Sequence, residues 1–279
     1  MRIRPASLAD YPHFAALYPE LGAPDPTPDE ARWSAEMAEH TLLVEQGASV
    51  VGYGYSVVVG SMLYVRQLVT AKSARRRGFG RALMEAMKAG GRTRGATRFC
   101  LYVVPDNTAA LALYRSLGLE IVRPSIALRL SFDAAETLPA RASIRTEQVA
   151  SSGSSDAGIE AALGLLSGQL AMLRAQGRAI FVAYDGDAPV GLAPFDPAFP
   201  GAFPFRARDA STVRALCAEM RAVARPELHA EGWRRLGVQI VIEADEALVG
   251  VLVAAGAEVS LHTVLMEGEL GGQDIGRPS

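Results

Sequence analysis

The chain has 279 residues, more than one typical domain needs, so its length favours two domains. Hydrophobic residues make up 49% and charged residues 21%, and the net charge of −2 gives no general attraction to nucleic acid or to anionic membranes. With no signal pattern and no apolar run of about 18 residues, we expect a cytoplasmic protein. The bias to arginine and alanine suggests a GC-rich bacterial genome. We expect Cys100 and Cys217 to be buried thiols rather than a disulfide.

The first 60 residues predict a short strand, two helices and two strands. A serine cap precedes the first helix, and a threonine cap with proline at N1 and glutamate at N3 precedes the second. A turn at residues 46 to 48 separates the strands. The predicted elements are the strand Arg2–Arg4, helices from Ser7 to Leu21 and from Pro28 to His40, and strands from Thr41 to Glu45 and from Val50 to Val59.

A turn that is rich in arginine and contains two glycines follows the next predicted strand. Residues 63 to 70 are rich in β-branched and aromatic side chains, which predicts a strand, and residues 81 to 89 have helical spacing up to Gly90. Between them, Arg75, Gly78 and Gly80 give the spacing R-x-x-G-x-G. The helix would begin with N–H groups that lack intrahelical partners, and its dipole adds positive charge there. The turn is therefore suited to a phosphate group.

A second motif follows the next apolar run. Residues 97 to 104 have the composition of a buried strand. A helix is then predicted with an Asp or Asn N-cap and with Gly118 as its C-terminal stop. Within it, Asn107, Ala110, Leu113 and Tyr114 match the pattern N-x-x-A-x-x-L-Y-x-x-x-G. Residues 119 to 132 would supply the last strand or strands.

Together the two motifs resemble the GNAT superfamily of acyl-CoA-dependent N-acyltransferases. The resemblance implies an α/β (α+β) fold with a mixed, mostly antiparallel sheet flanked by helices, and acetyl-CoA as co-substrate. It also implies that groups of the strand and the loop bind the coenzyme. The helix of the second motif would then lie next to the sulfur atom of the coenzyme. The cofactor-binding residues would be Leu68, Val69, Thr70, Arg75, Arg76, Arg77, Gly78, Phe79, Gly80, Arg81, Asn107, Ala110 and Tyr114.

The chemistry that the resemblance implies is direct attack of an amine on the thioester. Tyr114 would donate a proton to the leaving thiolate, unless its ring only packs on the core. Asn107 would bind the pantetheine arm or only cap its helix. The base stays open, because the strand before the loop carries no carboxylate: the candidates are Glu45, Glu20, His40 and Tyr64, or the amine arrives neutral. Asp25, Asp29 and Glu30 could attract a cationic amine. The histidines have no metal-ligand spacing, so no metal site is expected.

The second half of the sequence is similar to a degenerate copy of the first half. It repeats the opening strand near 142 to 148, a helix from 157 to 176, a hairpin at 179 to 193, and a strand and helix from 236 to 255. At the position of the basic turn it has Arg208 and Asp209 with no glycine, and Leu252 stands where Tyr114 would be. We therefore expect a coenzyme-binding domain over residues 1–136, a degenerate GNAT-like domain over 137–268, and a disordered tail over 269–279.

These features predict a tandem N-acetyltransferase that acts on a primary amine of a small or amino-acid-like molecule, as a monomer or homodimer. A non-catalytic acyl-CoA sensor is the main alternative, because it would keep the phosphate loop and need no base. A nucleic-acid-binding module using the arginines around residues 66 to 94 is a weaker alternative, because the net charge and the few interleaved aromatics argue against it.

Overall fold

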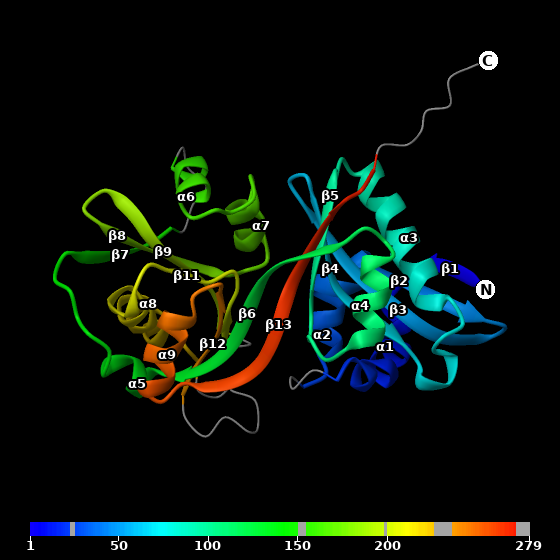
Figure 1. The fold of residues 1–279 in the computed structure, drawn as a ribbon, viewed down its shortest axis with the longest axis horizontal. Helices are drawn as coiled ribbons and strands as arrows, with labels where there is room; N and C mark the ends of the chain where they lie inside the picture. The colour runs from blue at the N-terminus through cyan, green and yellow to red at the C-terminus, as the bar shows by residue number, and fades with distance from the viewer. Residues whose placement is uncertain (23–25, 150–154, 198–199, 226–235, 272–279) are drawn as a thin grey trace, which may run out of the picture. The chain divides into compact units, whose positions relative to one another are not determined.

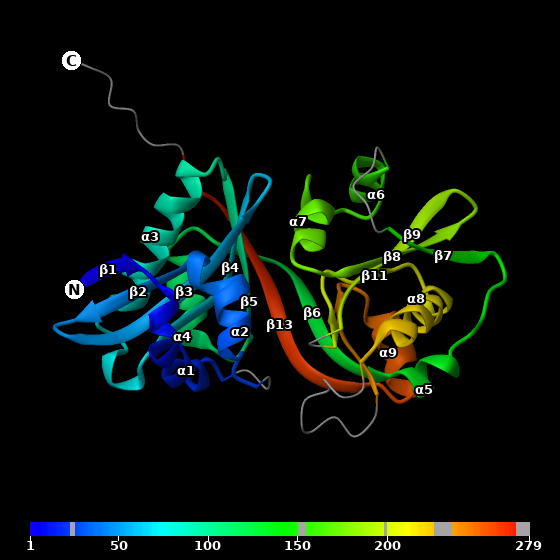
Figure 2. The same cartoon turned by 180° about the vertical axis from the view of Figure 1, so that it is seen from behind.

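The structure is a computed structural model, and we describe residues 1–22, 26–149, 155–197, 200–225 and 236–271 of it (Figures 1 and 2). Contacts divide the chain into two compact units. Unit 1 comprises residues 1–122 and 265–279, and unit 2 comprises residues 123–264. Two strands, β6 (Glu120–Ser131) and β13 (Glu258–Glu269), cross this division, so each gives residues to both units.

Unit 1 is a sheet with helices on both faces. Its strands follow the order β1-β2-β3-β4-β5-β13; β4 runs parallel to β5, and the pairs before β4 are antiparallel. The strands are β1 (Arg2–Pro5), β2 (Thr41–Gln46), β3 (Ser49–Val59), β4 (Met62–Thr70) and β5 (Arg98–Val103). The helices are η1 (Leu8–Asp10), α1 (Tyr11–Leu17), η2 (Tyr18–Leu21), α2 (Glu30–Arg32), the π-helical η3 (Trp33–Met37), η4 (Ala38–His40), η5 (Lys72–Ala74), α3 (Phe79–Thr93) and α4 (Thr108–Arg115).

The two faces of the unit-1 sheet carry different helices because side chains alternate along β3. On one face Tyr53 meets Phe14 of α1, with ring centroids 5.2 Å apart, and Phe14 stacks on Trp33. On the other face a Cβ at Gly54 would lie 2.9 Å from the Met87 side chain of α3. The first face holds α1 and α2, and the second holds α3 (Figures 1 and 2).

Several predicted ends of these elements are wrong for local reasons. The helix after the basic turn does not stop at Gly90 but runs to Thr93. It can do so because the next glycine, Gly91, lets the helix approach β4, where an added Cβ would lie 3.0 Å from Leu63. The second helix is capped by Asp29, whose side chain accepts from the Arg32 N–H, and not by Thr27. The prediction for the cysteines is confirmed, since both are buried and neither is in a disulfide.

Unit 2 contains the remaining strands of the sheet, and most of their pairs are antiparallel. Its strands are β7 (Ile144–Gln148), β8 (Ala179–Asp185), β9 (Ala188–Asp196), β10 (Gly201–Ala202), β11 (Arg206–Ala207) and β12 (Gly237–Glu243), with most of β6 and β13. The helices are α5 (Phe132–Glu136), α6 (Asp156–Ala162), α7 (Gln169–Ala175), α8 (Ala210–Val223) and α9 (Glu246–Ala254). Phe181 packs with α8 in one core, whereas its neighbours Ile180 and Val182 pack with α6 and α7 in another.

The division between the units differs from the one expected from the sequence. The predicted junction at Leu138 lies inside unit 2, where Leu138 is buried in the core with α8, because β6 runs on through residue 131 to pair with β12. Unit 1 also includes the C-terminal end of β13. The expected tail begins too early, since Glu269 belongs to β13 and Leu270 is buried. Residues 272–279 lie outside the described part of the chain.

The end of β13 completes unit 1 beside β5. Leu270 donates its N–H to the Thr97 carbonyl at 2.8 Å, and the Arg92 guanidinium donates to the Leu270 carbonyl. A side chain at Gly268 would place Cβ 2.4 Å from the Gly118 carbonyl oxygen, so glycine is required where the two backbones meet. The last strand of unit 1 therefore comes from the far end of the sequence.

Candidate functional site

The site of unit 1 lies where two parallel strands separate. β4 and β5 pair only from Met62 opposite Arg98 to Tyr64 opposite Cys100. On the other side of β4 the register with β3 shifts between Tyr55 and Ser56, which leaves Arg66 as an extra residue. Such a bulge bends and twists a strand. The rest of β4 is thereby free of β5 along one edge.

The free edge of β4 carries the strand residues predicted to bind the coenzyme. The Val69 carbonyl faces β3, because a Cβ at Gly52 would lie 2.6 Å from its oxygen. Backbone groups of successive residues point to opposite edges of a strand. We therefore assign the N–H groups of Leu68 and Thr70 to the edge that faces the opening. Val69 itself is buried with its backbone on the β3 side.

The basic turn ends in a left-handed residue followed directly by α3. Gly78 is the N-cap of α3 with φ of 83°, and Arg76 also has a positive φ, 62°. The first backbone bond of the helix joins the Ala82 N–H to the Gly78 carbonyl. Among the described residues, no group accepts a hydrogen bond from the N–H groups between Arg76 and Arg81. These donors and the helix dipole together form an anion-binding concavity.

The four arginines of the turn differ in how they are held. Arg75 is tied to η2, with its guanidinium 2.6 Å from the Glu20 carboxylate, and it also donates to the Thr70 carbonyl. Arg81 donates to the Ser116 hydroxyl at 2.6 Å. Arg77 lies over the Phe79 ring, with 5.5 Å between Cζ and the ring centroid. Arg76 has no protein partner within the described part of the chain.

Gly80 marks the point where the three parts of the site converge. A Cβ placed on it would lie 3.6 Å from Thr70 Oγ1 of β4 and 3.6 Å from Leu113 Cδ2 of α4, with Leu68 slightly farther away. These are ordinary van der Waals distances, so alanine would fit. A longer side chain at Gly80 would enter the space between α3, β4 and α4.

The residues predicted on α4 occupy the other side of that space. Asn107 is the N-cap of α4, and its Oδ1 accepts the Ala110 N–H at 3.1 Å, which confirms the capping role. Tyr114 lies one helical turn further on and is buried, with 8% of its surface exposed. Burial raises the pKa of Tyr114 to about 12. Its phenol therefore stays protonated at neutral pH and can act as a proton donor.

The carboxylates considered as the base are held elsewhere in the described structure. Glu45 on β2 pairs with Arg4 at 2.6 Å, and β3 separates its strand from β4. Glu20 pairs with Arg75. Of the residues expected to attract a cationic amine, Asp29 caps α2, and Asp25 lies outside the described residues. Glu20, Glu45 and Asp29 are therefore each held by a different partner.

A polar and aromatic cluster that the sequence did not reveal surrounds the bulge on β4. The Arg66 guanidinium lies 4.8 Å from the centroid of the Tyr64 ring, and Tyr64 meets Tyr102 edge-on at 6.0 Å. Tyr55 of β3 and Glu36 of η3 also act electrostatically on Arg66. The bulge makes these groups neighbours, and an alternating strand pattern gives no signal for a bulge. Tyr64 is the one base candidate that lies in this cluster.

Unit 2 has a different group at the position of the basic turn. Asp209 is the N-cap of α8 and accepts from both the N–H and the hydroxyl of Thr212. Its carboxylate also pairs with Arg141 and Arg208. A negative charge stands where a phosphate would have to approach the helix. That the phosphate loop is confined to the first half stays a prediction.

None of the helices in the described residues is long and apolar enough to cross a membrane. No three His, Cys, Asp or Glu side chains in that part of the chain come together as a metal-binding group.

Comparisons with known proteins agree with the arrangement of unit 1. The sequence model described as "Acetyltransferase (GNAT) family" matches residues 10–119. No curated protein matches the sequence. Three solved structures are similar over nearly the whole chain. A candidate acetyltransferase from Pyrococcus horikoshii has a TM-score of 0.70 and 15% identity, covering 96% of this chain and 89% of its own.

The second structure is a tandem GNAT protein from the clavulanic acid biosynthesis pathway, with a TM-score of 0.63 and 20% identity, and coverage of 98% of this chain and 99% of its own. The third is a GCN5-related N-acetyltransferase from Sphaerobacter thermophilus, with a TM-score of 0.65 and 16% identity, and coverage of 97% and 96%. At these identities the likeness concerns the fold. Residues 10–119 thus match the sequence model of the GNAT acetyltransferase family, and the chain as a whole has a fold similar to that of a tandem GNAT protein.

Proposed function

We propose that the protein is an N-acetyltransferase that moves the acetyl group of acetyl-CoA to a primary amine of a small, amino-acid-like molecule. The observation that carries the proposal is the set of N–H groups from Arg76 to Arg81, for which the described residues offer no acceptor, placed beside the open edge of β4. The first feature suits the diphosphate of the coenzyme. The second suits its pantetheine arm, which can bond to the strand edge as an added strand does.

In the proposed complex, backbone groups do most of the holding. Arg76 and Arg77 are exposed and supply charge-assisted contacts to phosphate, whereas Arg75, tied to Glu20, fixes the turn. The N–H of Leu68 or Thr70 would polarise the thioester carbonyl.

The chemical step is one substitution at the acetyl carbon. The amine nitrogen forms a bond to the carbonyl carbon as the bond from that carbon to sulfur breaks. The leaving thiolate takes its proton from the Tyr114 phenol. The proton lost by the amine then returns the phenolate to its neutral form, directly or through water. This cycle leaves no proton unaccounted for and needs no buried carboxylate.

We place the acceptor on the sheet face that carries the cluster around the bulge. Arg66 brings a guanidinium to this face, and Glu36, whose carboxylate lies 3.6 Å from Arg32, brings a negative charge. Tyr64 and Tyr102 supply flat, partly polar walls. A molecule with both an amine and a carboxylate fits this set better than a simple hydrocarbon amine.

A non-catalytic acyl-CoA sensor is the second candidate. It is favoured by one observation, namely that the carboxylates Glu20 and Glu45 are held in ion pairs with arginines. A sensor would bind the coenzyme as tightly as the enzyme does but would release no free thiol with any amine.

Calorimetric titration of acetyl-CoA tests the proposal. We expect micromolar, one-site binding to wild type and its loss in Gly80→Glu, which puts a side chain and a negative charge into the space between α3, β4 and α4. Gly90→Glu is the matched control, because it adds the same side chain to the same helix where nothing lies within 4 Å. Wild type that binds no acetyl-CoA would overturn the proposal. Binding without thiol release across a broad amine panel would favour the sensor.

A further inference from the structure

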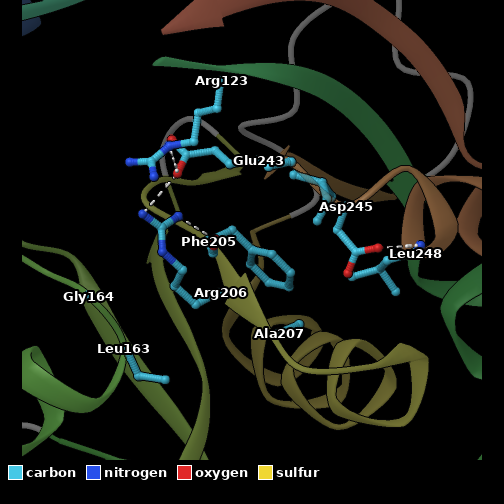
Figure 3. Close-up of a pocket in the computed structure, with 11 residues that line it drawn as sticks. Arg123, Leu163, Gly164, Phe205, Arg206, Ala207, Glu243, Asp245 and Leu248 are labelled. Carbon is cyan, nitrogen blue, oxygen red and sulfur yellow. Dashed lines mark hydrogen bonds and ion pairs between the residues drawn. The ribbon is translucent and has the colours of Figure 1, made fainter. Parts of the chain in front are cut away.

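Unit 2 contains a pocket that the proposed acetyl transfer does not use. Its volume is about 390 Å³, within the range of small-molecule sites, and all its lining residues belong to unit 2 (Figure 3). It opens where β10 and β11 part from β12. Gly201 and Ala202 of β10 pair with β12, whereas Arg206 and Ala207 of β11 pair only with β9. One wall is therefore β11, and the other is the end of β12 with the start of α9.

Two guanidinium groups meet at one end of this pocket. Arg206 lies 3.1 Å from the Glu243 carboxylate and Arg123 lies 3.5 Å from the same oxygen. The Glu243 side chain is only 9% exposed, and its carboxylate pairs with both guanidinium groups. Two positive charges against one negative charge leave this end of the pocket positive. Arg123 Nε is buried and makes no hydrogen bond.

The donors that remain on the two guanidiniums suit a carboxylate. Each guanidinium carries five N–H groups, and Arg206 uses one on the Phe205 carbonyl and one on Glu243. The others can form the paired bonds that arginine makes to planar anions. Glu243 acts as a positioning residue, since it fixes both cations without filling their remaining donors.

The middle and the far end of the pocket have other properties. Phe205 and Leu248 are buried, and Leu163 adds a third apolar side chain. In Figure 3 the Asp245 carboxylate lies on the opposite side of Phe205 from the two guanidiniums. Asp245 caps α9 by accepting the Leu248 N–H at 2.9 Å. Its charge opposes a second anionic group at that end.

We propose that this pocket binds a small monocarboxylate with an apolar tail, its carboxylate on Arg123 and Arg206 and its tail against Phe205 and Leu248. The ligand carries a single anionic group, because the Asp245 carboxylate lines the other end of the pocket. The inference goes beyond the proposed function and does not depend on it, since none of these residues belongs to unit 1.

Nuclear magnetic resonance titration of the full chain with 4-methylpentanoate tests the inference. We expect saturable shifts of amide signals from residues 205–207 and 242–248. The carboxylate should be needed, so 4-methylpentanamide should bind roughly 10- to 100-fold more weakly. Hexanedioate, with a second carboxylate, should also bind more weakly than the monocarboxylate.

Two variants locate the site, and one serves as the control. Arg123→Met keeps the aliphatic stem and leaves Glu243 paired with Arg206, and Leu163→Phe narrows the pocket without changing its charge. Each should weaken binding about tenfold or more, with thermal melts to verify folding. Arg145→Met, which removes an exposed arginine outside the pocket, should change nothing. Absence of saturable binding at millimolar concentrations, equal binding of the amide, or binding lost in Arg66→Met but kept in Arg123→Met would each overturn the inference.

Discussion

Replacing Tyr114 by phenylalanine isolates the proton that the proposed mechanism gives to the leaving thiolate. With the pKa of Tyr114 at about 12, roughly one phenol in 100,000 is ionised at pH 7, so nearly every molecule has the proton in place. A positioned general acid contributes about 10²- to 10⁴-fold to a rate. We expect kcat to fall by about 10²-fold or more, with KM for acetyl-CoA nearly unchanged, because the ring and its packing remain.

The assay follows release of the coenzyme thiol with a chromogenic disulfide, using an amine that wild type accepts. Tyr184→Phe, which changes a tyrosine of unit 2, is the control and should keep wild-type kcat. Within the described residues the Tyr114 hydroxyl has no protein partner, so the variant should melt within a few degrees of wild type. Equal kcat in wild type and Tyr114→Phe would refute the assignment of this proton donor.

The raised pKa of Tyr114 also predicts the stability of the protein in alkali. Below pH 10 the phenol is neutral in both the folded and the unfolded chain, and its ionisation has no effect. Between about pH 10 and 12 the unfolded chain releases the proton first, so the free energy of unfolding falls, by at most about 3 kcal/mol. Tyr114→Phe should lose less stability over this range. Parallel unfolding curves for the two proteins would contradict the burial of the phenol.

Three further predictions concern stability, each measured by urea unfolding. Gly90→Ala should raise the free energy of unfolding by about 0.5–1 kcal/mol, because glycine is unfavourable inside a helix and nothing lies within 4 Å of the added Cβ. Gly91→Val should lower the free energy of unfolding, because its Cβ would crowd Leu63. The reverse order of stability would contradict the packing of α3. Leu270→Ala should cost about 2–5 kcal/mol, and no loss would mean that β13 does not close unit 1. Asp10→Asn should destabilise the protein at pH 7 and should make its free energy of unfolding depend less on pH in acid. The reason is that hydrogen bonds from its arginine partner hold the pKa of Asp10 well below the usual range, so the stabilisation exists above about pH 4 and is lost as the pH falls.

Local patterns were enough to predict most of the elements around the site. The strand before the turn, the left-handed glycine at the start of α3 and the asparagine cap of α4 each depend on a few neighbouring residues. The helix expected over residues 157–176 shows where this fails, because Gly164 and Gly168 both adopt positive φ and divide it into α6 and α7. Apolar spacing alone did not locate that interruption.

Other features depend on partners distant in the sequence, and no local pattern could predict them. The ion pair between Arg75 and Glu20 joins residues that four helical segments and three strands separate in the sequence, so the turn alone placed Arg75 only among the coenzyme-binding residues. The bulge at Arg66 follows from how β3 and β4 pair. The pocket of unit 2 needs Arg123, Arg206 and Glu243 from three separate segments, and each looks like an ordinary charged residue in the sequence.

The end of β13 has a consequence for how the protein is made. A ribosome releases residues 1–122 of unit 1 before those of unit 2, and domains generally fold in that order. Here the strand beside β5 is built from residues 265–269, which leave the ribosome only after all of unit 2. The unit that is begun first therefore has to wait until the other has been synthesised before its sheet is complete. A chain that stops before residue 265 would lack that strand, so unit 1 depends for its completion on synthesis of the whole of unit 2.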